Sequence, residues 1–202
     1  MPDPLSISGE ASLAPTTLRI TALSVAEPIR LFFALWPEAN LQQAFFETGL
    51  KLYQRCGGRR TRRENIHLTL AFLGAVEVDR MQCVTDVADR ITLPACNMLF
   101  TRLGWWRQNQ VAWAATDEPP RALVDLVKQL QWGLTAQGFK FDERRFQPHV
   151  TLLREANCPP GLVESQPIVW RAHEFVLVRS TLREDGPHYA IVQRWPLQTI
   201  TN

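Results

Sequence analysis

Apolar and polar residues alternate between residues 64 and 74, and this pattern predicts a β-strand. Side chains on a strand point alternately to its two faces, so the apolar side chains at even positions from Ile66 to Phe72 can fill one face. His67, Thr69 and Ala71 then share the other face. His67 and Thr69 are two residues apart and would project side by side, about 7 Å apart at roughly 3.3 Å per residue.

A second stretch, residues 146–153, repeats this arrangement. His149 and Thr151 would share one face of a strand, while the aliphatic residues between and after them point to the opposite face. A single His-x-Thr pair on a strand is more often a polar surface that meets water. Two of the four histidines, however, lie in the same His-aliphatic-Thr-Leu frame, and the repetition favours a shared functional site.

The remaining periodicity predicts an alternation of strands and helices. Each strand that carries a histidine follows a helix through a connector containing arginines, so the chain shows a weak internal duplication of a strand-helix-strand unit. Two similar lobes facing each other would bring both His-Thr faces into one cleft. The other predicted strands are 29–36, 99–106, 110–116, 169–170, 174–181 and 189–195, and the predicted helices are 38–52, 79–91 and 121–138.

Composition indicates an ordinary globular protein. The 202 residues suffice for one large domain or two small lobes, and 46% of them are hydrophobic and 21% charged. The formal net charge of +2 excludes a bulk nucleic-acid coat protein. Residues 1–28 contain four prolines and few charges, and we expect a flexible N-terminal extension before a single domain spanning residues 29–198.

The cysteines and the apolar runs bear on location. Cys56, Cys83, Cys96 and Cys158 show neither a CxxC motif nor metal-ligand spacing, so we expect inert thiols in a reducing compartment. The chain shows no signal peptide, and no run approaches the roughly 20 apolar residues of a membrane span. The expectation is a cytoplasmic protein that does not enter a membrane.

A loop with four arginines leads directly into the first histidine strand. Charged runs of this kind are usually solvated, but Arg59 to Arg63 lie only a few residues before His67. Their guanidinium groups are well placed to steer an anionic substrate, and we single out Arg59 and Arg62 as substrate-binding residues.

Two histidines that face each other across a cleft can perform concerted acid-base catalysis. Their ordinary pKa near 6.5 lets one be neutral and the other protonated near pH 7. The neutral imidazole takes a proton from water and the imidazolium gives one to a leaving oxygen. The neighbouring threonine hydroxyls can donate to phosphate oxygens, which suits in-line displacement at phosphorus.

Other chemistries fit the sequence less well. A catalytic zinc site usually needs three protein ligands, and nothing in the spacing of His173 and His188 suggests that they complete one. The sequence has no GxSxG motif for a serine nucleophile. It also lacks the GxxxxGK[ST] and GxGxxG loops that bind nucleotide phosphates.

The paired motifs resemble the signature of the two-histidine phosphoesterase superfamily, and within it the bacterial RNA 2',3'-cyclic phosphodiesterases, also called 2'-5' RNA ligases. The resemblance covers about residues 29–197. The matching stretches are residues 30–35, 64–74 and 146–154, together with Trp106 and residues 111–113 in a hairpin.

The resemblance implies an α+β fold with two pseudo-twofold-related lobes, antiparallel sheets lining a central cleft, and helices outside. It implies hydrolysis of a 2',3'-cyclic phosphate to a 2'-phosphomonoester without a metal, ATP or other cofactor. By carry-over, His67 resembles the proton donor to the leaving 3' oxygen and His149 the base that activates water. Thr69 and Thr151 would hold phosphate oxygens.

The family usually carries an arginine shortly before the second motif, in an Arg-Pro-Phe-x-Pro-His pattern. Arg144 matches this arginine, while Arg145 stands where proline is common, which leaves open which of the two reaches the phosphate. Phe33, in the first matching stretch, is the aromatic residue expected to contact the substrate.

Three functions remain to be distinguished. The first is a monomeric enzyme acting on RNA with 2',3'-cyclic phosphate ends, which can also join 2'-5' ends in reverse. The second is the same chemistry on a small cyclic nucleotide such as ADP-ribose 1'',2''-cyclic phosphate. The third is an RNA-binding module without turnover, against which the intact pairs of histidines and threonines argue.

Overall fold

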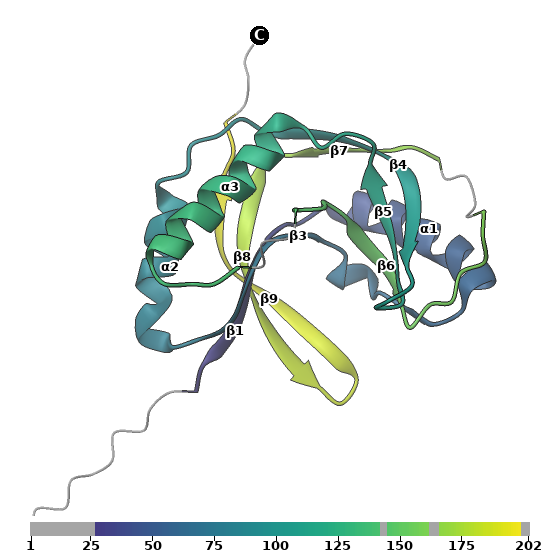
Figure 1. Ribbon diagram of the computed structural model, residues 1–202, viewed down its shortest axis with the longest axis horizontal. Helices are drawn as coiled ribbons and strands as arrows, with labels where there is room; N and C mark the ends of the chain where they lie inside the picture. Colours follow the sequence, from purple (N-terminus) through teal and green to yellow (C-terminus); the bar gives the residue numbers. More distant parts are fainter. Residues whose placement is uncertain (1–26, 142–144, 162–165, 199–202) are drawn as a thin grey trace, which may run out of the picture.

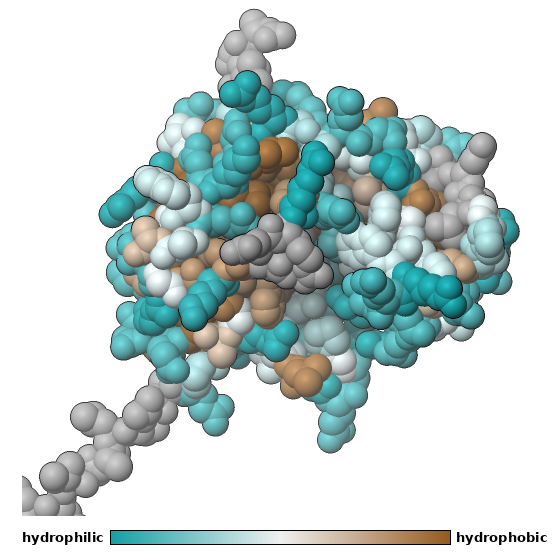
Figure 2. Space-filling model, in the orientation of Figure 1, coloured by the Kyte–Doolittle hydropathy of each residue, from teal (hydrophilic) through white to brown (hydrophobic). Residues whose placement is uncertain are grey.

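The structure is a computed structural model that describes residues 27–141, 145–161 and 166–198. Most of the predicted N-terminal extension lies outside the described residues, so the division of the chain at residue 28 stays a prediction. Among the described residues, no helix is both long and apolar enough to cross a membrane. Figure 1 shows a bent sheet with two lobes, α1 beside one lobe and α2 and α3 beside the other. In the same orientation, hydrophilic residues cover most of the face of the molecule that Figure 2 shows.

The predicted helices and strands are present, with shifted ends. The first helix ends at Cys56 rather than at residue 52, and a short strand in the arginine loop was not predicted. Two 3₁₀ turns, η1 (Arg63–Asn65) and η2 (Val78–Arg80), also occur. The helices are α1 (Ala39–Cys56), α2 (Met81–Asp89) and α3 (Arg121–Ala136), and the strands are β1 (Ile29–Leu35), β2 (Arg59–Arg60), β3 (Leu68–Val76), β4 (Cys96–Trp106), β5 (Val111–Thr116), β6 (Val150–Arg154), β7 (Ile168–Ala172), β8 (Glu174–Arg183) and β9 (Gly186–Pro196).

The strands form a nine-stranded sheet in the order β7-β4-β5-β6-β3-β1-β8-β9, with β2 paired to β6. The named strands pair antiparallel throughout. At the centre of the described part of the sheet, β3 and β6 pair through Leu68 and Val150 alone. On their other sides, β3 pairs with β1 and β6 pairs with β5 over several residues. The predicted α+β fold with two lobes is confirmed, and one continuous sheet connects the lobes.

The predicted duplication is present as the units β1-α1-β3 and β5-α3-β6. In each unit the first and last strands are neighbours in the sheet. The two halves of the chain are interleaved, however. The β7-β4-β5-β6 lobe and the β3-β1-β8-β9 lobe each take two strands from before α3 and two from after it, and α1 and α3 pack against the histidine strand of the opposite unit.

Strand β1 lies inside the sheet, as its apolar character on both faces predicts. Phe33 and its alternate neighbours face the main core. Phe32 and Ala34 face the other side, where they pack with Val176 and Val178 of β8. A strand buried on both faces is held firmly, so it forms a rigid support for the adjacent β3.

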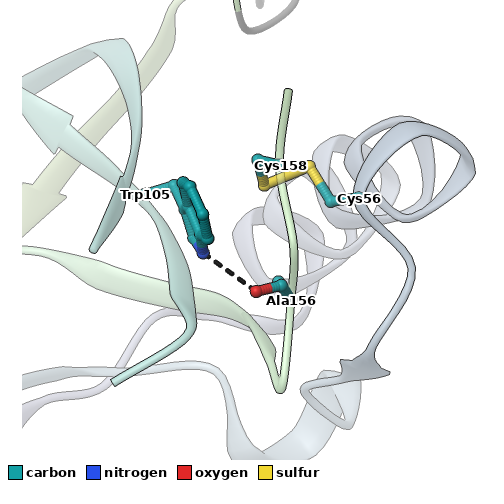
Figure 3. Close-up of a disulfide and its surroundings, with 4 residues drawn as sticks. All are labelled: Cys56, Trp105, Ala156 and Cys158. Atoms are coloured by element: carbon teal, nitrogen blue, oxygen red, sulfur yellow. Dashed lines mark hydrogen bonds between the residues drawn. A yellow bond between two sulfur atoms is a disulfide. The ribbon is translucent and has the colours of Figure 1, made fainter. Parts of the chain in front are cut away.

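The expectation of four inert thiols is wrong for two cysteines. Cys56, at the end of α1, and Cys158, after β6, form a disulfide between positions 102 residues apart, while Cys83 and Cys96 are free. Figure 3 shows the bond beside Trp105, whose Nε1 donates a hydrogen bond to the carbonyl of Ala156. Sequence spacing gives no indication of this pairing, which follows from the packing of α1 against β6.

Candidate active site

The two His-x-Thr motifs meet at the centre of the sheet. His67 directly precedes β3 and His149 directly precedes β6, and the residues that follow them, Leu68 and Val150, form the pair that joins these strands. Residues on either side of such a pair share one face of the sheet. The histidines and threonines therefore face the same side in a nearly twofold arrangement. His67 and His149 are diagonal neighbours across the two strands, and in a regular antiparallel pair such residues lie about 7 Å apart.

Both strands contain a β-bulge one residue after the threonine. In β3, Leu70 is the extra residue between the pairs of Thr69 and Ala71 with β1. In β6, Leu152 is the extra residue between the pairs of Thr151 and Leu153 with β5. A bulge shifts the alternation of faces by one residue and can re-aim side chains at a functional site.

The bulges correct the predicted face assignment. Ala71 is buried, and Phe72, expected on the apolar face with Leu68, is 47% exposed beneath the guanidinium of Arg30. In β6 the same shift buries Leu153 and leaves Arg154 exposed on the side of Thr151. Sequence alternation alone did not identify Arg154 as a site residue.

His67 is enclosed by aromatic rings. Trp36 stacks on its imidazole at 5.3 Å between ring centroids with an interplanar angle of 7°, while Phe32 and Tyr189 approach at 5.0 and 5.3 Å. Its Nδ1 donates to the carbonyl of Asn65 at 2.7 Å, which leaves Nε2 as the reactive atom. In the neutral state, Nε2 accepts a hydrogen bond from the Thr69 hydroxyl at 3.1 Å.

His149 is held in a matching way but has different neighbours. Its Nδ1 donates to the carbonyl of Gln147 at 2.8 Å, so Nε2 is again the reactive atom. One tryptophan ring, that of Trp106, meets the imidazole edge-on at 4.5 Å. Trp113 packs against Trp106 at an interplanar angle of 44°, with 5.3 Å between ring centroids.

The surroundings favour neutral histidines in the free site. Burial lowers the pKa of His67 to about 4, and the positive charges of Arg154 and His149 add to this effect, against the hydrogen bond to Asn65. Burial also lowers the pKa of His149, with Arg154 again contributing. A phosphodiester anion bound between them would favour the imidazolium form of either ring.

A cavity of about 260 Å³ adjoins this face. Its lining includes His67, Thr151 and Arg154 together with Tyr189. The arginine loop supplies another wall, so the cavity combines an imidazole, a hydroxyl and several guanidinium groups, which suit a phosphate ester. The loop and hairpin residues that line it are Arg59, Arg60, Thr61, Arg62, Asn65, Asp185 and Pro187.

The other predicted site residues have different positions. Arg59 and Arg62 line the cavity, where Arg59 pairs with Glu155 at 3.3 Å. Arg144 lies outside the described residues. Phe33 cannot contact a substrate, because it is fully buried against Phe175 and Trp195. Its neighbour Phe32 contacts His67 instead, and the sequence did not indicate which of the two adjacent phenylalanines faces the site.

The β8–β9 hairpin closes one side of the cavity through contacts that sequence reasoning missed. Asp185 accepts a hydrogen bond from Arg62 at 3.0 Å, which lowers the pKa of the carboxyl to about 2. His188, which nothing in the sequence placed at this site, has its Nε2 2.8 Å from the carboxylate of Asp185 and 3.3 Å from the guanidinium of Arg62. The Asn65 amide donates to the carbonyl of Pro187 at 2.8 Å. These contacts connect the hairpin to the turn that carries His67.

Within the residues that the structure describes, no group of three or more His, Cys, Asp and Glu side chains is arranged to hold a metal ion.

Comparison with known proteins identifies the family. The model of the LigT-like phosphoesterases matches residues 35–113 and again residues 114–189. The chain belongs to the LigT-like phosphoesterase family. The two matches meet within β5, between Trp113 and Ala114, and each contains one His-x-Thr motif. The family resemblance expected from the paired motifs is confirmed.

Relatives within the family agree in sequence and in structure. An RNA 2',3'-cyclic phosphodiesterase of Escherichia coli is 32% identical over 86% of this chain and 99% of its own length. One of Thermotoga maritima is 29% identical over 81% of this chain and 93% of its own length. The crystal structure of E. coli LigT complexed with 3'-AMP has a TM-score of 0.80 and 31% identity, and it covers 85% of this chain and 99% of that chain.

Proposed function

We propose that this protein hydrolyses 2',3'-cyclic phosphate ends of RNA to 2'-phosphomonoesters with two histidines and no metal or other cofactor. The observation that carries the proposal is the pair of imidazoles on one sheet face, each with Nδ1 bound to a backbone carbonyl. The E. coli and T. maritima relatives are named RNA 2',3'-cyclic phosphodiesterases, which supports the substrate and the bond that is cleaved. One chain supplies both histidines, so we propose that the protein acts as a monomer. We also propose that it is cytoplasmic.

The proposed reaction is an in-line displacement at phosphorus. His149 accepts a proton from water at Nε2, and the oxygen of that water attacks phosphorus opposite the 3' oxygen. The bond from phosphorus to the 3' oxygen breaks, and His67 gives its Nε2 proton to that oxygen. The 2' oxygen keeps the phosphate. When the 5' hydroxyl of another strand replaces water, the same steps form a 2'-5' linkage.

The groups around the histidines supply the charge stabilisation. Thr69 and Thr151 donate hydrogen bonds to non-bridging phosphate oxygens, which gain negative charge in the transition state. Arg154 lines the same cavity and attracts the phosphate from the side of β6. Arg59 and Arg62 line the same cavity and add positive charge. We also propose Arg144 as a substrate-binding residue, on its match to the family pattern alone.

The first test is hydrolysis of an RNA oligomer ending in a 2',3'-cyclic phosphate, in EDTA and without ATP, with the product ends identified. We expect a 2'-phosphate product. His67→Ala and His149→Ala should each reduce turnover by about 100-fold to 10,000-fold, the usual contribution of a general acid or base. Both variants should still bind the RNA, because the threonines and arginines remain.

The outcomes separate the competing functions. Turnover close to that of the wild type in either folded variant would refute the two-histidine mechanism. A 3'-phosphate product would keep the acid-base pair and reverse which oxygen leaves. A strong preference for ADP-ribose 1'',2''-cyclic phosphate over RNA would favour the small-nucleotide function. RNA binding by the wild type without turnover of either substrate would favour a binding module.

A further inference from the structure

A second groove lies next to the catalytic cavity and shares a wall with it. It has a volume of about 800 Å³, against about 260 Å³ for the cavity. Residues 59–62 line both, so the groove continues the cavity across the arginine loop towards α1. The far side of the groove is formed by Gln43, Phe46 and Tyr53 of α1.

The groove gathers positive charge. Glu64 is the one acidic residue in its lining, against four arginines. Arg59 and Arg62 have carboxylate partners in Glu155 and Asp185. Among the described residues, Arg60 and Arg63 have no carboxylate within salt-bridge distance. Two uncompensated guanidinium groups in one groove favour an anionic ligand.

Aromatic rings of α1 hold one of these guanidinium groups in place. The guanidinium carbon of Arg60 lies 5.4 Å from the ring centroid of Phe46 and 5.6 Å from that of Tyr53. Tyr53 is 44% exposed although it is aromatic. Arg63 is oriented by a hydrogen bond to Gln43 at 3.3 Å. Cations interleaved with aromatic rings are typical of surfaces that bind single-stranded nucleic acid, where bases stack on rings and on guanidinium planes.

The chemistry of the substrate determines what continues into this groove. When the cyclic phosphate lies between the histidines, its 2' and 3' oxygens are both used, so the strand can leave the terminal ribose only through the 5' oxygen. The cavity is smaller than the roughly 300–1,000 Å³ of common ligand pockets, so the next nucleotides must lie outside it. We propose that the groove binds the nucleotides immediately 5' of the cyclic phosphate end of a single-stranded RNA.

This inference rests on the proposed function. Binding in the groove would make the enzyme selective for oligomers over mononucleotides. The test compares kcat/KM for an RNA oligomer ending in a 2',3'-cyclic phosphate with kcat/KM for a nucleoside 2',3'-cyclic monophosphate. Tyr53→Ala and Arg63→Gln change residues that line the groove but not the catalytic cavity. The double variant should lower the ratio of the two values by at least tenfold.

Two controls make the test specific. Tyr53→Phe keeps the ring and should retain the wild-type ratio. Arg121→Gln makes the same charge change on α3, where the side chain is 94% exposed and lines neither the cavity nor the groove. It should also retain the wild-type ratio.

The salt dependence gives a second readout. Arg63→Gln should remove one phosphate contact and so reduce the slope of log kcat/KM against log salt by about 0.7 for the oligomer, the value per phosphate of a single strand.

The failures of the two proposals are distinguishable. The groove proposal would be wrong if the wild type hydrolysed oligomer and mononucleotide with equal kcat/KM. It would also be wrong if the folded double variant kept the wild-type ratio of the two kcat/KM values. Either result would leave the proposed function intact. Failure of the wild type to hydrolyse either substrate would overturn both. Thermal unfolding of each variant checks that it is folded.

Discussion

The imidazoles of His67 and His149 differ in their surroundings, although the backbone around them is nearly symmetric. Each Nδ1 is bound by the carbonyl two residues earlier. His67, however, lies among three aromatic rings, whereas His149 meets the edge of Trp106. Burial is the main reason that both pKa values are low, and Arg154 lowers both further. The free enzyme therefore carries few imidazolium ions at neutral pH.

The low pKa values of His67 and His149 predict an acidic optimum for kcat/KM, because kcat/KM reports the protonation of the free enzyme. The proposed mechanism needs one imidazole protonated and the other neutral, so the active fraction should be largest between the two pKa values. The pKa of His67 is about 4 and that of His149 lies below 6.5. We expect kcat/KM for RNA hydrolysis to decline by about tenfold per pH unit above pH 6.5.

Arg154→Gln provides the matched test of this pH dependence. Removing a positive charge raises the pKa of both histidines, so the decline should move to higher pH, in addition to a lower maximal rate. A wild-type kcat/KM that rises between pH 7 and 8, or a variant profile that does not move, would contradict this electrostatic account.

At the scale of single elements, the bulges of β3 and β6 determine which side chains reach the site. Alternation correctly predicts that each histidine shares a face with its threonine. It fails beyond the bulges, where Phe72 becomes exposed and Arg154 reaches the cavity. A bulge depends on pairing with the neighbouring strand, so a single strand's hydrophobic pattern does not reveal it. The hydrophobic pattern of each strand thus predicted which side chains face the candidate site as far as the threonine, but not after the bulge.

The hairpin of β4 and β5 supports His149 through a chain of aromatic contacts, which Gly104→Ala should disturb. Gly104 pairs with Trp113, and a Cβ at this position would lie 2.1 Å from the indole ring. A displaced Trp113 would disturb the position of Trp106, which contacts His149. We expect the free energy of unfolding to fall by about 1–3 kcal/mol, as in overpacked sites, and kcat to fall as well.

Denaturant unfolding and steady-state kinetics measure these two effects. Gly49→Ala is the matched control, because its Cβ would lie 3.7 Å from Leu152, an ordinary contact within α1. Alanine in a helix interior should stabilise the protein by about 0.5–1 kcal/mol relative to glycine. An equal response of the two variants would show that the aromatic contacts do not transmit strain to His149.

At the scale of the whole molecule, the Cys56–Cys158 disulfide joins the end of α1, where the arginine loop begins, to the segment after β6. Sequence spacing could not predict it, because the two cysteines are 102 residues apart and meet only in the folded chain. The architecture, in contrast, was predictable, because the paired motifs and the repeated strand-helix-strand unit are both local patterns. The inference of a reducing compartment from four free thiols loses its support for this pair.

Replacing both disulfide cysteines with serine should lower stability. A cross-link over so long a loop restricts the unfolded chain strongly, and loss of a native disulfide typically costs about 2–5 kcal/mol. We expect a lower unfolding midpoint in the Cys56→Ser, Cys158→Ser variant. Reductant should lower the wild-type midpoint to the same value and leave the variant unaffected. Cys83→Ser, which removes a free thiol, should behave like the wild type, and equal midpoints for all three proteins would contradict this role.

The interleaving of the two halves has a consequence for how the molecule comes apart. Each lobe contains strands from before and after α3, and each repeated unit's helix packs on the opposite histidine strand. Detaching the second half of the chain would leave both lobes with apolar strand edges unpaired. We therefore expect folding to be cooperative over the whole domain, with neither half an autonomous folding unit despite the internal repeat.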